Sequence, residues 1–293
     1  MTAPNRNPPA AYAALAASGV LWGSSFILGK VALRELGVND MILYRFTIKS
    51  LGFLPFLLRH PPRFDRHDLG LVLVAALVGV PLQFLVQFGG LALTTASHAA
   101  LMIGTAPVLV AAAAHVVLHE RHHRSTWVAL LISTVGVVLI VLQAGAHGAS
   151  ASLVGDVMVL VSMFGAVAWV LISKTLMARH SALAVSGTVT VAGTLMLAVW
   201  VLARYGLPPV ALHRPTWLAV VALGLVATTC ATVLWNWGLS HVSAGRAGAF
   251  INLEPVVGAV LGVWLLHEQL GSLAIAGGVL ILAAAVGVTL QET

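Results

Sequence analysis

Two cationic side chains lie one helical turn apart inside a long apolar stretch. Arg45 and Lys49 are four positions apart, and Tyr44 precedes them, so an α-helix would place both cations on one face. Such a face can bind a carboxylate. Glu254 lies in another apolar stretch, where its carboxylate could accept a substrate ammonium group or a proton. An ionisable residue at the bilayer centre costs about 3 kcal/mol on insertion scales and usually faces a partner or water. In the structural alternative, Arg45 pairs permanently with Glu254 or binds backbone carbonyls.

Amide and aromatic side chains form a second group of candidates, because amides beside aromatic rings suit the wall of a substrate cavity. Trp is also typical of membrane interfaces, so the interfacial interpretation stays open. The candidates for substrate binding in this group are Gln83, Gln87, Trp22, Trp169, Trp235, Asn236 and Asn252.

Prolines, glycines and two lysines suggest mechanical roles. Pro107 and Pro255 each interrupt the hydrogen-bond ladder of a helix, and such kinks could act as hinges or leave carbonyls open to a cavity. Lys30 and Lys174 fall near the ends of apolar stretches, where cations extend to the interface; the alternative is one cation at each mouth of a transport path. The glycine pairs Gly19/Gly23 and Gly258/Gly262 have the GxxxG spacing that permits close helix packing.

One motif suggests an enzyme. Residues 119–123 read His-Glu-Arg-His-His and satisfy HExxH, the zinc-protease signature. The motif lies at the end of an apolar stretch, and a related segment has His267 and Glu268 but Gly271 in place of the second histidine. No third ligand stands out, and the single cysteine, Cys230, excludes a cysteine-rich metal site. We therefore expect no catalytic residue, metal or cofactor.

The composition sets the environment in which these residues act. Of 293 residues, 59% are hydrophobic and 8% are charged, against roughly 25% charged residues in soluble domains. The composition therefore excludes a soluble domain and a disordered chain. The net charge of +6 comes from basic residues scattered singly, which argues against nucleic-acid binding. The chain is expected to be an all-α polytopic membrane protein.

Ten apolar stretches have about the 20 residues that a transmembrane helix needs. They lie near residues 11–33, 40–58, 69–93, 97–118, 126–144, 153–177, 184–203, 217–240, 245–266 and 271–290. Eight Lys and Arg residues fall in connections on the N-terminal side of the membrane, and three fall on the other side. The positive-inside rule then predicts that both termini are cytoplasmic, in an inner membrane.

An internal repeat divides the chain into a short head, residues 1–10, and two five-helix halves, residues 11–144 and 153–290. The pairs Pro107/Pro255, His119/His267 and Glu120/Glu268 are each 148 residues apart. Because five is odd, the second half enters the membrane in the opposite orientation. Inverted repeats are typical of secondary transporters, which hold substrate near the bilayer midplane.

Several motifs resemble one transporter family. They are Trp22-Gly23-Ser24-Ser25-Phe26 followed by Lys30, Arg45-Phe46, Leu253-Glu254-Pro255 and Leu265-Leu266-His267-Glu268. In order and spacing the chain resembles the drug/metabolite transporter superfamily, in its ten-helix EamA-type branch. The resemblance implies ten helices around a central cavity and transport of small organic solutes, commonly amino acids. Lys49 lies outside this pattern, which makes it the better candidate for specificity.

We therefore expect a secondary transporter that exports small zwitterionic or anionic metabolites, amino acids or their relatives, by alternating access. The sequence has no GxxxxGK[ST] motif for ATP, so a gradient must supply the energy, with protons as the candidate coupling ion. The export direction rests on the resemblance. The alternatives are exchange of organic anions or phosphorylated metabolites through Lys30, Lys49 and Lys174, and an intramembrane zinc protease. The expected partners are a small-molecule solute and the lipid bilayer, and the sequence leaves monomer or homodimer open.

Overall fold

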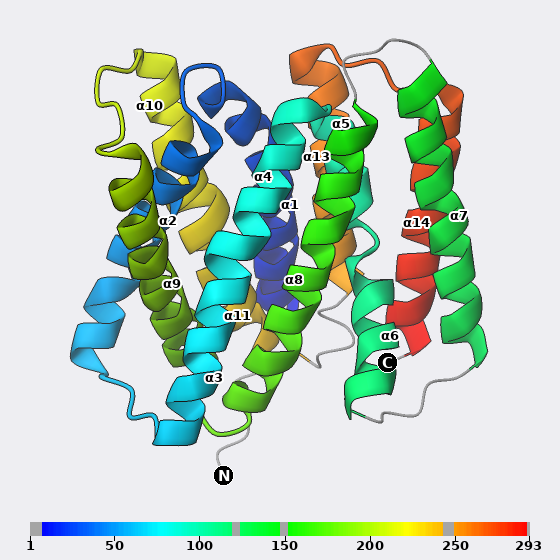
Figure 1. The fold of residues 1–293 in the computed structure, drawn as a ribbon. Helices are drawn as coiled ribbons and strands as arrows, with labels where there is room; N and C mark the ends of the chain where they lie inside the picture. Colours follow the sequence, from blue (N-terminus) through cyan, green and yellow to red (C-terminus); the bar gives the residue numbers. More distant parts are fainter. Residues whose placement is uncertain (1–7, 119–123, 147–151, 243–248, 292–293) are drawn as a thin grey trace. The chain divides into compact units, whose positions relative to one another are not determined.

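The computed structural model describes residues 8–118, 124–146, 152–242 and 249–291 (Figure 1). The helices are α1 (Pro8–Ala32), α2 (Val38–Arg59), α3 (Arg66–Leu77), α4 (Gln83–Leu93), α5 (Ala96–Ile103), α6 (Ala106–Leu118), α7 (Arg124–Ala146), α8 (Leu153–Met177), α9 (Ala182–Tyr205), α10 (Arg214–Val221), α11 (Ala231–Leu239), α13 (Leu253–Leu266) and α14 (Ser272–Gln291), with the π-helices η1 (Val78–Leu82) and η2 (Ala222–Cys230) and the 3₁₀-helix η3 (Ala249–Asn252). No strand occurs in these ranges.

The helices account for the ten predicted spans. Six of them are long and apolar enough to cross a membrane, and four shorter apolar helices complete the set within the described ranges. Their ends lie within a few residues of the predicted ones wherever both are described. The prediction of an all-α polytopic membrane protein is confirmed.

Two spans contain π-helical turns that hydropathy did not predict. The third span runs through α3, η1 and α4, and its π turn contains Pro81. The eighth runs through α10, η2 and α11. In η2 the hydroxyls of Thr228 and Thr229 donate to the carbonyls of Leu223 and Gly224, five residues earlier. The wider π-helical register thus gains side-chain hydrogen bonds of its own.

The fourth span, predicted over 97–118, is interrupted next to Pro107, where the sequence predicts a break in the helical hydrogen-bond ladder. The helix is divided between α5 and α6 at Gly104 and Thr105, immediately before Pro107, which lacks the N–H that an unbroken ladder needs. The ninth span changes from the 3₁₀-helix η3 to α13 just before Pro255.

The chain forms two compact units. The first unit contains Met1–Ile27, Thr95–Ala149 and Cys230–Thr293, and the second contains Leu28–Thr94 and Ser150–Thr229. Each unit therefore takes helices from both predicted halves. In the first unit α7 packs on α14 and α5 on α13; in the second, α2 packs on α9 and α4 on α8.

Matched glycines make matched helix contacts in the two units. A Cβ on Gly90 would lie 2.6 Å from the carbonyl oxygen of Gly155, so α4 packs directly on α8, the first span of the second half. A Cβ on Gly238, 148 positions later, would lie 2.7 Å from Leu15 of α1, the first span of the first half. This correspondence supports the predicted repeat.

Candidate functional site

Arg45 is buried in the second unit, on the face of α2 that meets α4 and η2. Its side chain is 4% exposed, and its Nε donates a hydrogen bond of 3.0 Å to Oγ1 of Thr228. The guanidinium carbon lies 4.8 Å from the ring centre of Phe84 and 5.0 Å from that of Phe88, both on α4. These distances are those of cation–π contacts, so Arg45 joins three elements.

Lys49 lies one turn further along the same face and is half-buried. Its Nζ lies 5.6 Å from the ring centre of Phe46 and 5.9 Å from that of Phe53. Among the residues that the structure describes, no carboxylate lies within ion-pair distance of this ammonium group. The α2 helix thus presents a positive charge bordered by aromatic faces.

Tyr44 lies beside this pair but has a partner elsewhere. Its hydroxyl donates to the carbonyl of Pro209 at 3.1 Å, and its ring lies 5.3 Å from that of Trp217 at an angle of 66°. The side chain therefore ties α2 to α10 and the segment before it. A substrate contact of Tyr44 stays a prediction.

The amides of α4 lie on a different face from its phenylalanines. Gln83 and Gln87 are buried, and a Cβ on Gly165 of α8 would lie 3.2 Å from Cβ of Gln83. Oε1 of Gln87 has no hydrogen-bond partner among the described residues. Trp169 of α8 packs its indole ring against Gly79 of η1. The structure thus groups Phe84 and Phe88 with Arg45 and places Gln83 and Trp169 between the third span and α8.

The remaining candidates lie in the first unit. The rings of Trp22 and Trp235 are 5.3 Å apart, and Nδ2 of Asn236 donates to the carbonyl of Thr232 in its own helix at 2.9 Å. Asn252 is 6% exposed, and neither amide atom has a hydrogen-bond partner in the described ranges. Glu254 lies in the first turn of α13.

The predicted gating residues occupy the ends and breaks of helices. Lys30 lies in the last turn of α1 and Lys174 in the last turn of α8, as expected for cations that extend to an interface. Pro107 and Pro255 follow the helix breaks of the fourth and ninth spans. Their roles as gates or hinges stay predictions.

The His-Glu pair of the second half has a structural role. His267 ends α13 in the left-handed conformation, with φ of 54°. The Glu268 carboxylate accepts the N–H groups of Ala96 and Ser97, at 2.7 and 2.8 Å, and the Ser97 hydroxyl at 2.7 Å. It therefore satisfies free donors at the start of α5. The HExxH residues 119–123 lie outside the described residues.

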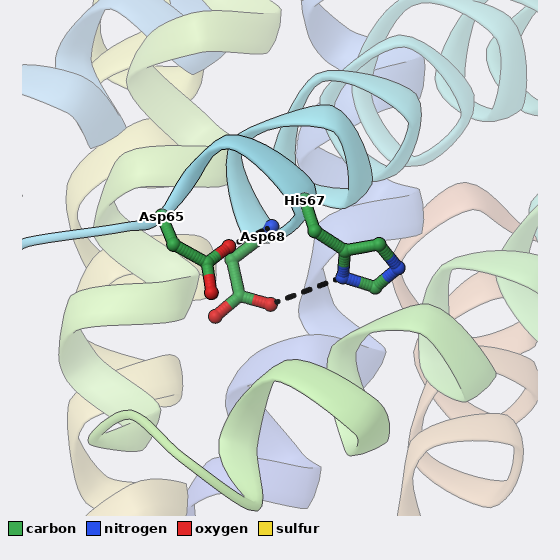
Figure 2. A group of neighbouring side chains, drawn as sticks. All are labelled: Asp65, His67 and Asp68. Atoms are coloured by element: carbon green, nitrogen blue, oxygen red, sulfur yellow. Dashed lines mark hydrogen bonds and ion pairs between the residues drawn. The ribbon is translucent and has the colours of Figure 1, made fainter.

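A second ionisable cluster lies at the start of α3. The potential ligand atoms of Asp65, His67 and Asp68 lie within 4.8 Å of one another (Figure 2). The Asp68 carboxylate, however, accepts a hydrogen bond from Arg179 and pairs with His180 at 2.8 Å. Asp65 Oδ1 accepts the backbone N–H of Asp68 at 2.7 Å as a helix cap.

The contacts of this cluster indicate a structural role. A guanidinium beside Asp68 opposes a divalent cation, so the cluster acts as an ion-pair junction between α3 and the segment joining α8 to α9. Sequence reasoning did not identify this junction. Nor did it identify Thr228, whose only signal is a hydroxyl inside an apolar span.

Comparison with known proteins places this geometry in context. The EamA-like transporter family matches residues 9–142 and again residues 153–290. The uncharacterized transporter YetK of Bacillus subtilis (strain 168) is 29% identical over 88% of this chain and 80% of its own length. A protein of Streptantibioticus cattleyicolor named as a probable terminal-alkyne amino-acid exporter is 28% identical over 91% of this chain and 89% of its own.

The same fold occurs among solved structures. One crystal structure matches 97% of this chain and 97% of its own with a TM-score of 0.67 and 20% sequence identity. At that identity the match concerns the fold.

Proposed function

Because the chain belongs to the EamA-like transporter family, we propose that it exports small zwitterionic metabolites, amino acids or their relatives, by alternating access. Family membership makes it a membrane transporter of small-molecule solutes. Export from the cytoplasm, an inner-membrane location, cytoplasmic termini and proton coupling are parts of the proposal. The loop charges support the orientation.

The Lys49 ammonium group carries the proposal. It lies inside α2, a candidate membrane span, with the rings of Phe46 and Phe53 at 5.6 and 5.9 Å and no carboxylate of the described residues within ion-pair distance. Such a charge within a membrane calls for a partner, and a substrate carboxylate would provide a charge-assisted contact. The relative named as an amino-acid exporter favours an amino-acid carboxylate.

Two residues of the first unit are proposed to contact a substrate or coupling ion. Glu254 is the candidate for accepting an amine or a proton. The Asn252 amide, buried without a hydrogen-bond partner among the described residues, is the candidate for a polar contact, because an unsatisfied buried amide is costly.

Three terminal-alkyne probes separate the two charge requirements: L-propargylglycine, its analogue without the amino group, and its analogue without the carboxyl group. Azide cycloaddition detects each of them. Purified protein in proteoliposomes should transport the amino acid better than either analogue. Lys49→Gln should raise KM for the amino acid about tenfold or more, since it removes a charged contact.

Arg204→Gln is the matched control, because Arg204 also lies over an aromatic ring, that of Tyr205 at 6.0 Å, but at the end of α9. It should leave KM unchanged. An unchanged KM in Lys49→Gln would contradict the assigned role of Lys49. Equal transport of the analogue without an amino group would instead support exchange of organic anions.

A further inference from the structure

Arg45 and Lys49 share one helix face but have different surroundings. The Lys49 ammonium lies over the rings of its own helix, whereas the Arg45 guanidinium both hydrogen-bonds Thr228 and lies over two rings of α4. We propose that Arg45 and Thr228 form a positioning pair that holds the π-helical turn η2 against α2. This pair thereby sets the transport rate, while Lys49 binds the substrate carboxylate. The inference rests on the proposed function and adds to it separate roles for Arg45 and Lys49.

The first support is the role of the Thr228 hydroxyl. It accepts the hydrogen bond from Arg45 at 3.0 Å and donates its own hydrogen to the carbonyl of Leu223. One oxygen thus links the guanidinium to the carbonyl ladder of the π turn. A change at Arg45 is passed directly to the turn.

The second support is the close packing of α2 and η2 around this link. A Cβ on Gly224 would lie 2.7 Å from Cβ of Ile48 and 2.9 Å from the carbonyl oxygen of Arg45. A Cβ on Gly52 would lie 2.6 Å from the methyl group of Thr229. Because Arg45, Ile48 and Gly52 follow a helical repeat, one face of α2 lies against the π turn.

The third support is the chemistry of arginine. A guanidinium can contact the Phe84 and Phe88 rings while its Nε donates in its own plane to Thr228, and the ammonium of lysine has no such donor fixed in a planar group. Lysine at this position keeps the charge and loses the bridge. The proposal therefore predicts that Arg45→Lys lowers the transport rate although the charge is unchanged.

The test is a split between rate and affinity for L-propargylglycine in proteoliposomes. Thr228→Val and Arg45→Lys should each lower the maximal rate about tenfold, as expected for loss of one hydrogen bond from a charged donor. Their KM values should stay near that of the wild type. Thr228→Ser should restore the rate, and the double variant should be no slower than either single one.

Thr229→Val is the matched control in the same turn, because it removes the hydroxyl bonded to Gly224 and leaves Arg45 its partner. Its rate should stay near that of the wild type. An equal loss in Thr229→Val would overturn the pairing with Arg45. A rise in KM in Arg45→Lys as large as that in Lys49→Gln, with the rate unchanged, would make Arg45 a substrate ligand and also overturn it.

A second measurement needs no substrate and separates this inference from the proposed function. The amide N–H groups of η2 (Ala222–Cys230) exchange with deuterium, and their exchange rate, measured by mass spectrometry on the purified protein, reports on the turn. The rate should change severalfold in Thr228→Val and Arg45→Lys but stay constant in Thr228→Ser. Constant exchange in all variants would overturn the inference, whatever the wild-type protein transports.

Discussion

Single glycines set how closely helices approach in this protein. At Gly23, in α1, a Cβ would lie 2.7 Å from the carbonyl oxygen of Glu254 and 2.8 Å from Cβ of Val257. Backbone atoms and a β-branched side chain cannot move aside as the tip of a flexible side chain can. The GxxxG spacing of Gly19 and Gly23 therefore serves packing between α1 and α13.

Gly23→Ala should accordingly lower the free energy of unfolding by about 1–3 kcal/mol through overpacking. A Cβ on Gly70, in α3, would have no neighbouring atom of the described residues within 4 Å, so Gly70→Ala should be neutral or raise stability by up to about 1 kcal/mol. Thermal unfolding in detergent measures both variants. Equal effects of the two substitutions would contradict the packing argument.

Residue types made Arg45 and Lys49 candidates for the site, but their spacing left the neighbouring helices unknown. Arg45 and Lys49 share a face, as predicted, and Phe84 and Phe88 join them. Helical spacing places Gln83 in the same helix as Phe84 and Phe88, yet only the structure shows that Gln83 packs toward Gly165 of α8. The neighbour of a helix face is set by the tertiary packing of the whole chain. The spacing of residues within one helix does not determine it.

At the scale of elements, ionic contacts fix two helix starts of the second unit. Asp68 ties the start of α3 to Arg179 and His180, and Glu35 ties the segment after α1 to His213 before α10. The backbone N–H of His213 donates to Glu35 Oε2 at 2.9 Å. That donor lowers the pKa of the Glu35 carboxyl, with further contributions from Thr216 and the His213 imidazole.

This lowered pKa gives a prediction with a defined sign. Because the folded state favours the Glu35 carboxylate, its stabilisation is present above the ordinary pKa of glutamate and is lost as the pH falls through the folded value. Glu35→Gln should therefore reduce the loss of thermal stability on acidification below about pH 4.5. Melting curves of the two proteins from neutral to acidic pH measure the difference.

His213→Gln is the matched control, since it keeps the backbone N–H that has the largest effect on Glu35. It should retain most of the wild-type acid sensitivity. Identical pH profiles for wild type and Glu35→Gln would show that another group dominates.

Hydropathy located the spans because it reports which segments lie in an apolar environment. It could not report the hydrogen-bond register within a span. The π turn η1 contains Pro81, the π turn η2 contains Thr228 and Thr229, and the division between α5 and α6 lies at Gly104, three residues before a proline. Such local changes in hydrogen bonding leave the mean hydropathy of the segment unchanged.

At the scale of the whole molecule, the two compact units do not coincide with the two halves of the chain that the family matches. The EamA-like family matches each half in turn, whereas the first and second units each combine helices from both. Spans of each half therefore pack on spans that lie far away in sequence. We expect neither half alone to form these units.

Orientation belongs to the same scale. The excess of Lys and Arg on the N-terminal side predicts cytoplasmic termini. A green fluorescent protein fused to either terminus should fluoresce, and alkaline phosphatase fused there should be inactive. Phosphatase inserted near Leu207, between α9 and α10, should be active. The opposite pattern would contradict the predicted topology.

The π turn η1 also bears on how this chain should be aligned with its relatives. A helix gains about 100° of rotation per residue, and a π turn accommodates one residue more than an α-helical turn does. The extra residue within Val78–Leu82 thus sets which side chains of α4 meet Arg45. A relative without it would have to carry its ring pair one position away from Phe84 and Phe88 to build the same contact, so column-by-column identity would understate the likeness of the two proteins.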